Sequence, residues 1–117
     1  MALALARLTE ITTVASSAGS VFANPASTTT YVRLIVLHNT NSTAETVAVW
    51  NVPDNAGSAG TAADANRVLY LSLAAADTVL FEFPGPGLVL EDENDTIQAA
   101  TTTASKVTIQ IHGAQET

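Results

Sequence analysis

The stretch Tyr31 to Val52, YVRLIVLHNTNSTAETVAVWNV, decides the fold because it combines two apolar runs with the clearest reversal of the chain. Residues 31–37 are rich in β-branched and aromatic types, and residues 46–52 are apolar again. Between them, residues 39–43 are of the polar types that bond their own backbone in turns. The stretch therefore predicts a β-hairpin at the centre of a sheet.

The strand at residues 31–37 is apolar on both of its faces. Alternation places Val32, Leu34 and Val36 on one face, whereas Ile35 and Leu37 lie on the other. A strand of this kind is expected to be covered on both sides. A sandwich of two sheets supplies such cover.

The strand pattern recurs at short intervals along the rest of the chain. Residues 67–73 and 78–83 alternate and predict a second hairpin, with Leu69, Leu71 and Leu73 facing the core. Residues 106–112 alternate most cleanly, and shorter strands are expected near residues 7–14, 88–90 and 96–101. With about eight strands and no convincing helix, the expected fold class is all-β: an antiparallel, jelly-roll-like β-sandwich.

The length of 117 residues fits one domain. We expect residues 28–117 to form the sandwich and residues 1–27 to form an N-terminal arm that contains the first strand. Leu3, Leu5 and Leu8 have no place in a sandwich closed from residue 28 onward, so we expect them on a neighbouring subunit. Residues 53–66 lack any apolar period, and a loop of this length is expected to be functional, mobile or held by a partner.

The composition argues against several partners. The net charge is −7, and the 4 basic residues are scattered at positions 7, 33, 67 and 106, so binding to nucleic acid or to an anionic membrane is not expected. There is no cysteine for a disulfide or a thiolate nucleophile. Only 13% of the residues are charged, against roughly a quarter in an average domain, which indicates that much of the surface meets another protein.

The sequence offers no catalytic constellation. The two histidines, His38 and His112, each end a predicted strand, and no nucleophile elbow accompanies them. We therefore expect structural or exposed histidines, no enzymatic activity and no cofactor.

The densest group of charges is Glu91, Asp92, Glu93 and Asp95. Several carboxylates in one turn can bind calcium, which takes oxygen ligands. The alternating aspartates and glycine of an EF-hand loop are absent, so a solvated turn is the first interpretation and a metal site the alternative.

Trp50 is the only tryptophan and lies on a predicted strand. Packing in the core is the first interpretation, and an anchor facing a partner is the second, because tryptophan is enriched at interface hot spots. The interface candidates of the whole chain are Leu3, Leu5, Leu8, Phe22, Tyr31 and Trp50.

The order of these segments resembles small virion proteins of tailed bacteriophages. The resemblance covers residues 28–113 and rests on His38-Asn-Thr-Asn, the strand ending in Trp50, the Gly/Ala-rich loop, LYLSL at residues 69–73, the acidic turn before Asp95-Thr-Ile, and KVTIQIHG at the C-terminal end. These proteins are head decoration or cement proteins, and similar domains occur in tails and fibres.

The resemblance implies a non-enzymatic structural protein that binds the major capsid protein as a dimer or trimer and stabilises the head. It would be made in the host cytoplasm, since no secretion signal is evident, and would be located on the outer capsid surface. The alternative is a tail or fibre module that binds a receptor or carbohydrate through Trp50, Tyr31 or Tyr70. No catalytic motif of the group is available to carry over.

Overall fold

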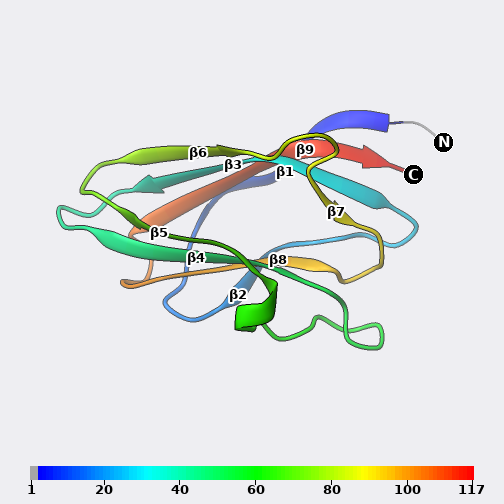
Figure 1. The fold of residues 1–117 in the computed structure, drawn as a ribbon, viewed down its shortest axis with the longest axis horizontal. Coiled ribbons are helices and arrows are strands. Elements are labelled where there is room, and N and C mark those ends of the chain that lie inside the picture. Colours follow the sequence, from blue (N-terminus) through cyan, green and yellow to red (C-terminus); the bar gives the residue numbers. More distant parts are fainter. Residues whose placement is uncertain (1–2) are drawn as a thin grey trace.

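The computed structural model describes residues 3–117, and in that range the chain forms nine strands in two antiparallel sheets stacked as a sandwich (Figure 1). The predicted all-β sandwich is therefore confirmed. In spatial order, the five-stranded sheet contains β1 (Leu3–Thr13), β9 (Val107–Glu116), β3 (Thr29–Asn39) and β6 (Thr78–Glu82), with β7 (Leu88–Leu90) also paired to β3. The four-stranded sheet contains β2 (Gly19–Ala23), β8 (Thr96–Thr101), β4 (Glu45–Val52) and β5 (Arg67–Leu73).

Most consecutive strands lie in opposite sheets. Both predicted hairpins are therefore wrong. β3 pairs with β6, β7 and β9 but not with β4, and β5 pairs with β4 but not with β6. The segments after β3 and after β5 are arches that cross from one sheet to the other.

The side chain of Asn39 fixes the two arches against each other. Its amide nitrogen donates to the carbonyl oxygens of Thr43 at 3.0 Å, Leu73 at 3.2 Å and Ala74 at 3.1 Å. These carbonyl oxygens lie at both arches. One buried amide therefore satisfies backbone carbonyl groups that would bond to a neighbouring strand if the chain formed hairpins. This bonding explains why a polar turn here redirects the chain across the sandwich.

The core lies between the sheets and takes apolar residues from both. Each large side chain buried there contributes on the order of 1.5–3 kcal/mol of transfer free energy. The predicted inward positions at residues 69, 73, 107, 109 and 111 are confirmed as buried, and Leu71 packs against the same cluster. The core members include Ile35, Leu37, Val47, Val49, Leu69, Leu73, Ile97, Val107, Ile109 and Ile111.

A β-bulge at Arg33 corrects the predicted faces of β3. The register with β9 shifts between Val32 and Leu34, so Val32 faces the core together with Ile35 and Leu37. Leu34 and Val36 face outward and remain half-buried. The expectation that both sides of this strand are covered is therefore wrong for the outer side, as far as residues 3–117 show.

The N-terminal segment belongs to the sandwich. β1 begins at Leu3, rather than near Arg7, and pairs with β9, while β2 pairs with β8. β2 brings the number of strands in residues 3–117 to nine, one more than the eight or so expected. The expected division between an arm and a sandwich at residue 27 does not describe residues 3–23.

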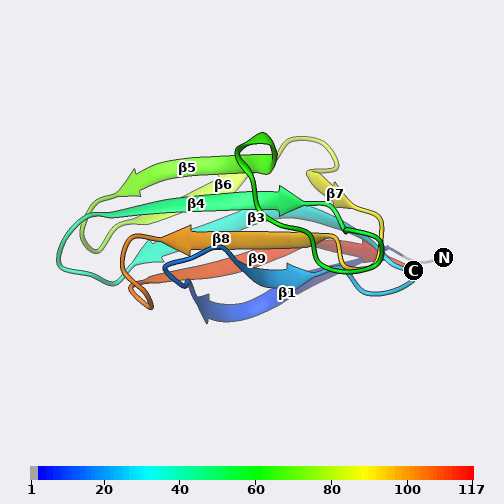
Figure 2. The ribbon, with the colours of Figure 1, turned by 90° about the horizontal axis from the view of Figure 1, so that it is seen from below.

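The long loop of residues 53–66 lies on the outer side of the four-stranded sheet, as Figures 1 and 2 both show. It is held there by its own chain: Asn94 Nδ2 donates to the Gly57 carbonyl at 2.7 Å, and Gln98 Nε2 donates to the Gly60 carbonyl at 3.0 Å. The loop ends in η1 (Asp64–Asn66), a 3-10 turn, and no helix in residues 3–117 could cross a membrane.

Candidate functional site

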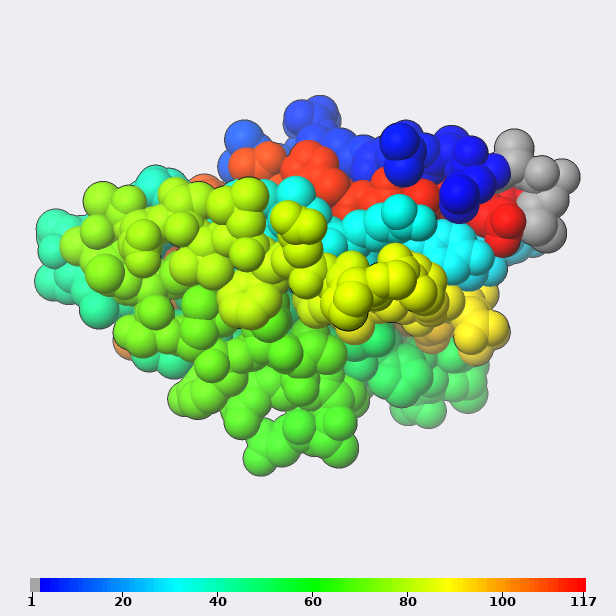
Figure 3. All heavy atoms as spheres, turned by 45° about the horizontal axis from the view of Figure 1, so that its top comes forward, coloured from blue at the N-terminus to red at the C-terminus, as the bar shows by residue number. Residues whose placement is uncertain are grey.

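The outer face of the five-stranded sheet holds most of the large apolar side chains that residues 3–117 leave exposed. Figure 3 shows β1, β9, β3 and β6 side by side on this face. Among residues 3–117, every exposed large apolar side chain except Tyr70 comes from a strand of this sheet. Those residues are Leu3, Leu5, Ile11, Leu80 and Val89.

On the side of β3 and the edge strand β6, this face has an apolar stripe formed by Leu34, Val36 and Leu80. Val36 lies opposite Leu80 in the ladder between β3 and β6, so the two side chains share the outer face. Leu80 is 61% exposed. Contiguous exposed apolar surface of this kind marks sites that bind other proteins. We call Leu34, Val36 and Leu80, together with Leu5 and Val89, the bare face.

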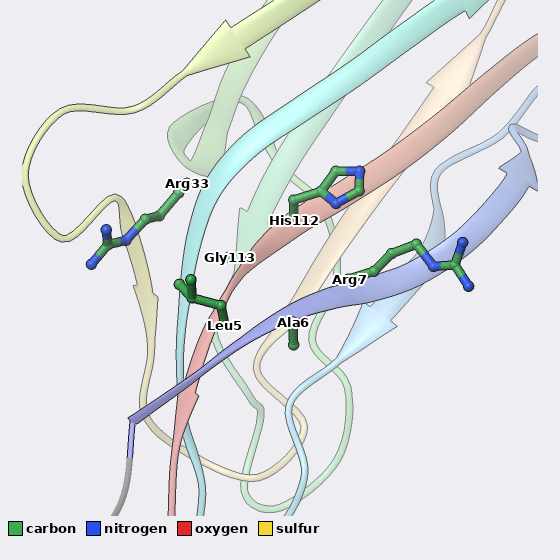
Figure 4. Close-up of a pocket in the computed structure, with 6 residues that line it drawn as sticks. All are labelled: Leu5, Ala6, Arg7, Arg33, His112 and Gly113. Atoms are coloured by element: carbon green, nitrogen blue, oxygen red, sulfur yellow. The ribbon is translucent and has the colours of Figure 1, made fainter.

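Beside the stripe, the face is hollowed between β1, β9 and β3. The hollow has a volume of about 440 Å³ and is lined by Leu5, Ala6, Arg7, Arg33, His112 and Gly113. Figure 4 shows the side chains of Arg7 and Arg33 extending away from each other, so they line its rim without converging on one point. Arg7 is also paired with Glu10 at 2.9 Å. The arrangement fits a protein surface better than a small anion.

Gly113 allows the backbones to approach beneath the hollow. A Cβ at this position would collide with the carbonyl oxygen of Tyr31. The bulge at Arg33 and the absence of a side chain at Gly113 lie at the same place in the ladder. The hollow is thus built into the sheet and was not visible in the sequence, where positions 7, 33 and 112 are far apart.

Tyr31, on β3, lies on the same outer side, next to the C-terminal end of β9. Its hydroxyl group donates to Glu116 Oε1 at 3.1 Å. This hydrogen bond, followed by partial burial and the negative charges of Glu116 and Glu91, raises the pKa of the Tyr31 phenol. Tyr31 is half-buried, and the hydrogen bond holds its side chain beside Val89 of the bare face.

The outer face of the four-stranded sheet carries a smaller aromatic group. Trp50 is half-buried on this outer side and does not join the core cluster, so the expectation of core packing is wrong. It pairs across the ladder with Arg67, whose guanidinium lies 4.2 Å from the centre of the Tyr70 ring. Tyr70 is 64% exposed, so this face does present a flat aromatic surface.

Other interface candidates have internal roles. Leu8 and Phe22 are half-buried and pack against the core of their own chain. The expectation that Leu8 lies on a neighbouring subunit is therefore wrong. Leu3 and Leu5 remain exposed, and their contact with a partner stays a prediction.

The acidic turn contributes only part of the predicted metal group. Asp92 and Asp95 lie with Asp54, and their carboxylate oxygens are within 4.8 Å of one another, whereas Glu91 and Glu93 are outside this cluster. Asp95 accepts backbone hydrogen bonds from Asp54 at 2.8 Å and from Asp92 at 3.0 Å. Its carboxylate therefore stabilises the turn and the start of the long loop. The sequence missed Asp54 because only the folded loop brings it to the turn.

Glu45 is a buried carboxylate that the sequence did not single out. Its oxygens accept from Asn41 Nδ2 at 2.9 Å, the Thr101 hydroxyl at 2.9 Å and the Thr103 backbone N–H at 2.7 Å. Burial acts to raise the pKa of Glu45, but these hydrogen bonds outweigh it and lower the pKa to about 2. The group ties β4 to β8 next to the arch, so its role is structural.

The histidines lie on the outer side of the five-stranded sheet. His38 Nδ1 is hydrogen bonded to Thr78 Oγ1 at 2.7 Å, and His112 lines the hollow. They lie on different rows of the ladder, opposite Thr108 and Leu34 respectively. In residues 3–117, no carboxylate is hydrogen bonded to either histidine ring, and a catalytic triad requires such an orienting acid.

Comparisons of the chain with protein-family models, with curated proteins and with solved structures find no match.

Proposed function

We propose that the chain is a non-enzymatic structural protein of a tailed bacteriophage virion, which binds the major capsid protein on the outside of the head and stabilises the shell. The observation that carries this proposal is the bare face. It presents apolar side chains on a rigid sheet and an open hollow in place of an enclosed pocket. A face of this form suits contact with another protein surface.

Two further features support the proposal. The sequence resembles decoration and cement proteins over residues 28–113, and the low charged fraction of 13% fits a surface that is largely in contact with protein. A module bound at many symmetric positions on a shell gains stability for the assembly from a modest contact at each position. A homo-oligomer, dimer or trimer, is part of the proposal.

The test is to label virions of the phage whose genome encodes the chain with an antibody against the purified protein. Immuno-electron microscopy should show label distributed over the head. Label on the tail or fibres would favour the second candidate function, and intact virions without any label would contradict both.

The second candidate is a carbohydrate- or receptor-binding module of a tail or fibre. It is favoured by one observation: exposed Tyr70, stacked under Arg67, lies near half-buried Trp50 on the four-stranded sheet. Aromatic faces of this kind bind sugar rings by stacking. Glycan-array binding that is lost in Tyr70→Ala, with Leu80→Ala as the matched control on the other face, would support this candidate. Absence of any glycan binding removes it.

A further inference from the structure

One edge of the five-stranded sheet is open. β1 stands at the end of the strand order and is paired on one side only, with β9. From Leu3 to Arg7 the pairing is regular, and both register shifts in this ladder come after Arg7. Residues 3–7 are thus a regularly paired strand segment whose outward backbone groups have no strand partner among residues 3–117. Figure 2 shows β1 along the rim of the sandwich.

This segment lacks the devices that usually protect a sheet edge. Natural edges are short, charged, bulged or covered, because unpaired strands invite another strand. Of the other edge strands, β6 spans 5 residues, β7 spans 3, and β2 spans 5 with a register shift. β5 is longer, with 7 residues, and carries the charge of Arg67 and a register shift near its start. β1 spans 11 residues, and its residues 3–6 are uncharged. Leu5 is 81% exposed and Leu3 is 56% exposed.

We propose that residues 3–7 pair antiparallel with the same residues of a second copy, about a two-fold axis at Leu5. The two five-stranded sheets then become one continuous sheet, and the outer faces of both copies form one surface. The inference rests on the homo-oligomer within the proposed function and not on attachment to a capsid. Strand addition of this kind derives affinity from backbone hydrogen bonds and specificity from the side chains beside them.

The register identifies the second copy as the occupant. A two-fold axis at Leu5 sets this residue against Leu5 of the second copy, and because Leu5 lies opposite Ala114 in its own sheet, no charge lies at the axis. A two-fold contact requires a self-complementary segment, and residues 3–6 meet that requirement.

The charges beside the axis are complementary. Arg7 lies opposite His112, and Leu3 lies opposite Glu116. Pairing about Leu5 places Arg7 of one copy opposite Leu3 of the other, with Glu116 of that other copy one strand further, about 10 Å away between backbones. Side chains of this length can meet across one leucine. The two-fold axis repeats this contact, so Arg7 of each copy faces Glu116 of the other copy.

The existing partner of Arg7 does not oppose this contact. Arg7 and Glu10 form an ion pair in which both side chains are largely exposed. Exposed pairs of this kind contribute little to stability, so Arg7 can exchange Glu10 for Glu116 of the second copy.

Sedimentation velocity of the purified chain over a range of concentrations tests the pairing. The wild-type protein should show a monomer–dimer equilibrium, and Leu5→Lys should weaken it at least ten-fold. Leu80→Lys is the matched control, because Leu80 is exposed on the same sheet but lies on β6. A protein that stays monomeric at millimolar concentration overturns the inference, as does a dimer that Leu80→Lys weakens as much as Leu5→Lys.

Charge reversal tests the same register. Arg7→Glu should weaken the dimer about ten-fold, and Arg7→Glu combined with Glu116→Arg should restore it. Arg33→Glu, in the hollow but on β3, should leave the dimer unchanged. Failure of the double variant to recover contradicts the two-fold register at Leu5.

Hydrogen exchange provides the backbone readout. In the monomer only alternate amides of residues 3–7 are protected by β9, whereas in the dimer the remaining amides should be protected as well. Unchanged exchange at these amides in a sample that is dimeric places the contact elsewhere. These measurements need no capsid, so their failure leaves the virion-labelling test of the proposed function untouched.

Discussion

The outer faces of the two sheets differ in how far the chain covers them. Residues 53–66 cover part of the outer face of the four-stranded sheet, where Val52, Thr96 and Gln98 are buried, whereas Tyr70 on the same face stays exposed. The five-stranded sheet has no such cover in residues 3–117, and Leu5 and Leu80 stay exposed. The chain therefore uses its longest loop to cover part of one face and leaves the other exposed, which is the face that we propose contacts a partner.

The difference between the two faces also predicts where substitutions change stability and where they change association. A covered face is fixed by intramolecular hydrogen bonds, and substitutions there act on stability. A bare face is held by the strands beneath it, so substitutions there should act on association and leave the fold intact. Each prediction below tests this separation.

The largest difference is expected from the same substitution made on both faces. Val52→Lys places a charge under the loop and should lower the free energy of unfolding by on the order of 3–5 kcal/mol, because buried charges without partners are costly. Leu80→Lys should stay within about 0.5 kcal/mol of the wild type. Denaturant unfolding of both variants measures this, and equal losses would show that the bare face is part of the folded core.

A smaller effect is expected where the loop meets the sheet. A Cβ at Gly60 would collide with the carbonyl oxygen of Pro53 and lie 3.0 Å from Val52 Cγ1. Gly60→Ala should therefore cost about 1–3 kcal/mol, since backbone must move to make room. Gly19→Ala is the control, because its Cβ would meet only the Ser17 carbonyl, at 3.8 Å. A fully stable Gly60→Ala variant would mean that the cover is not closely packed.

Substitution of Glu45 tests how much the end of the arch after β3 contributes to the stability of the fold, separately from the long loop. Its pKa is lowered from 4.5 to about 2, so the stability it provides is present above pH 4.5 and is lost as the pH falls toward 2. Glu45→Gln should lower the melting temperature at pH 7 by on the order of 5–10 °C and reduce the loss on acidification. Glu82→Gln, exposed on β6, serves as the control. An unchanged acid profile in Glu45→Gln contradicts this role.

The smallest effect concerns Tyr31, which lies beside Val89 of the bare face. Its raised pKa means that the protonated phenol stabilises the fold below pH 10, and that this contribution is lost as the pH rises through the folded-state pKa. Absorbance titration of tyrosinate should show a transition above pH 10 that disappears in Tyr31→Phe. Glu116→Gln should shift the transition back down, because the hydrogen bond to Glu116 is the main cause. A transition that stays in place excludes that bond.

Period-two alternation predicted most of the strands and the buried side of β5 and β9, because alternation depends on local geometry alone. It did not distinguish a hairpin from an arch. The turn after Asn39 has hairpin composition, and only contacts to Leu73 and Ala74, remote in sequence, direct the chain to the other sheet. The bulge at Arg33 had no local signal either, so the faces of Val32 and Leu34 were assigned together.

The candidate site was predicted in part. Leu3 and Leu5 were expected on a neighbouring subunit, which stays a prediction, and the sequence suggested an arm where the structure has an edge strand. The pairing of β1 with β9 joins segments from the two ends of the chain, and no local pattern encodes it. Trp50 was expected in the core because tryptophan is large and apolar, but alternation with buried Val49 turns it outward.

The central claim is that the bare face is the surface that contacts the partner. The most direct measurement is co-sedimentation of the purified chain with heads of the encoding phage from which this protein has been removed, comparing Leu80→Lys with Tyr70→Lys. Both residues are exposed, one on each face. The account predicts at least ten-fold weaker binding for Leu80→Lys and wild-type binding for Tyr70→Lys. Loss of binding in Tyr70→Lys with full binding in Leu80→Lys would contradict it.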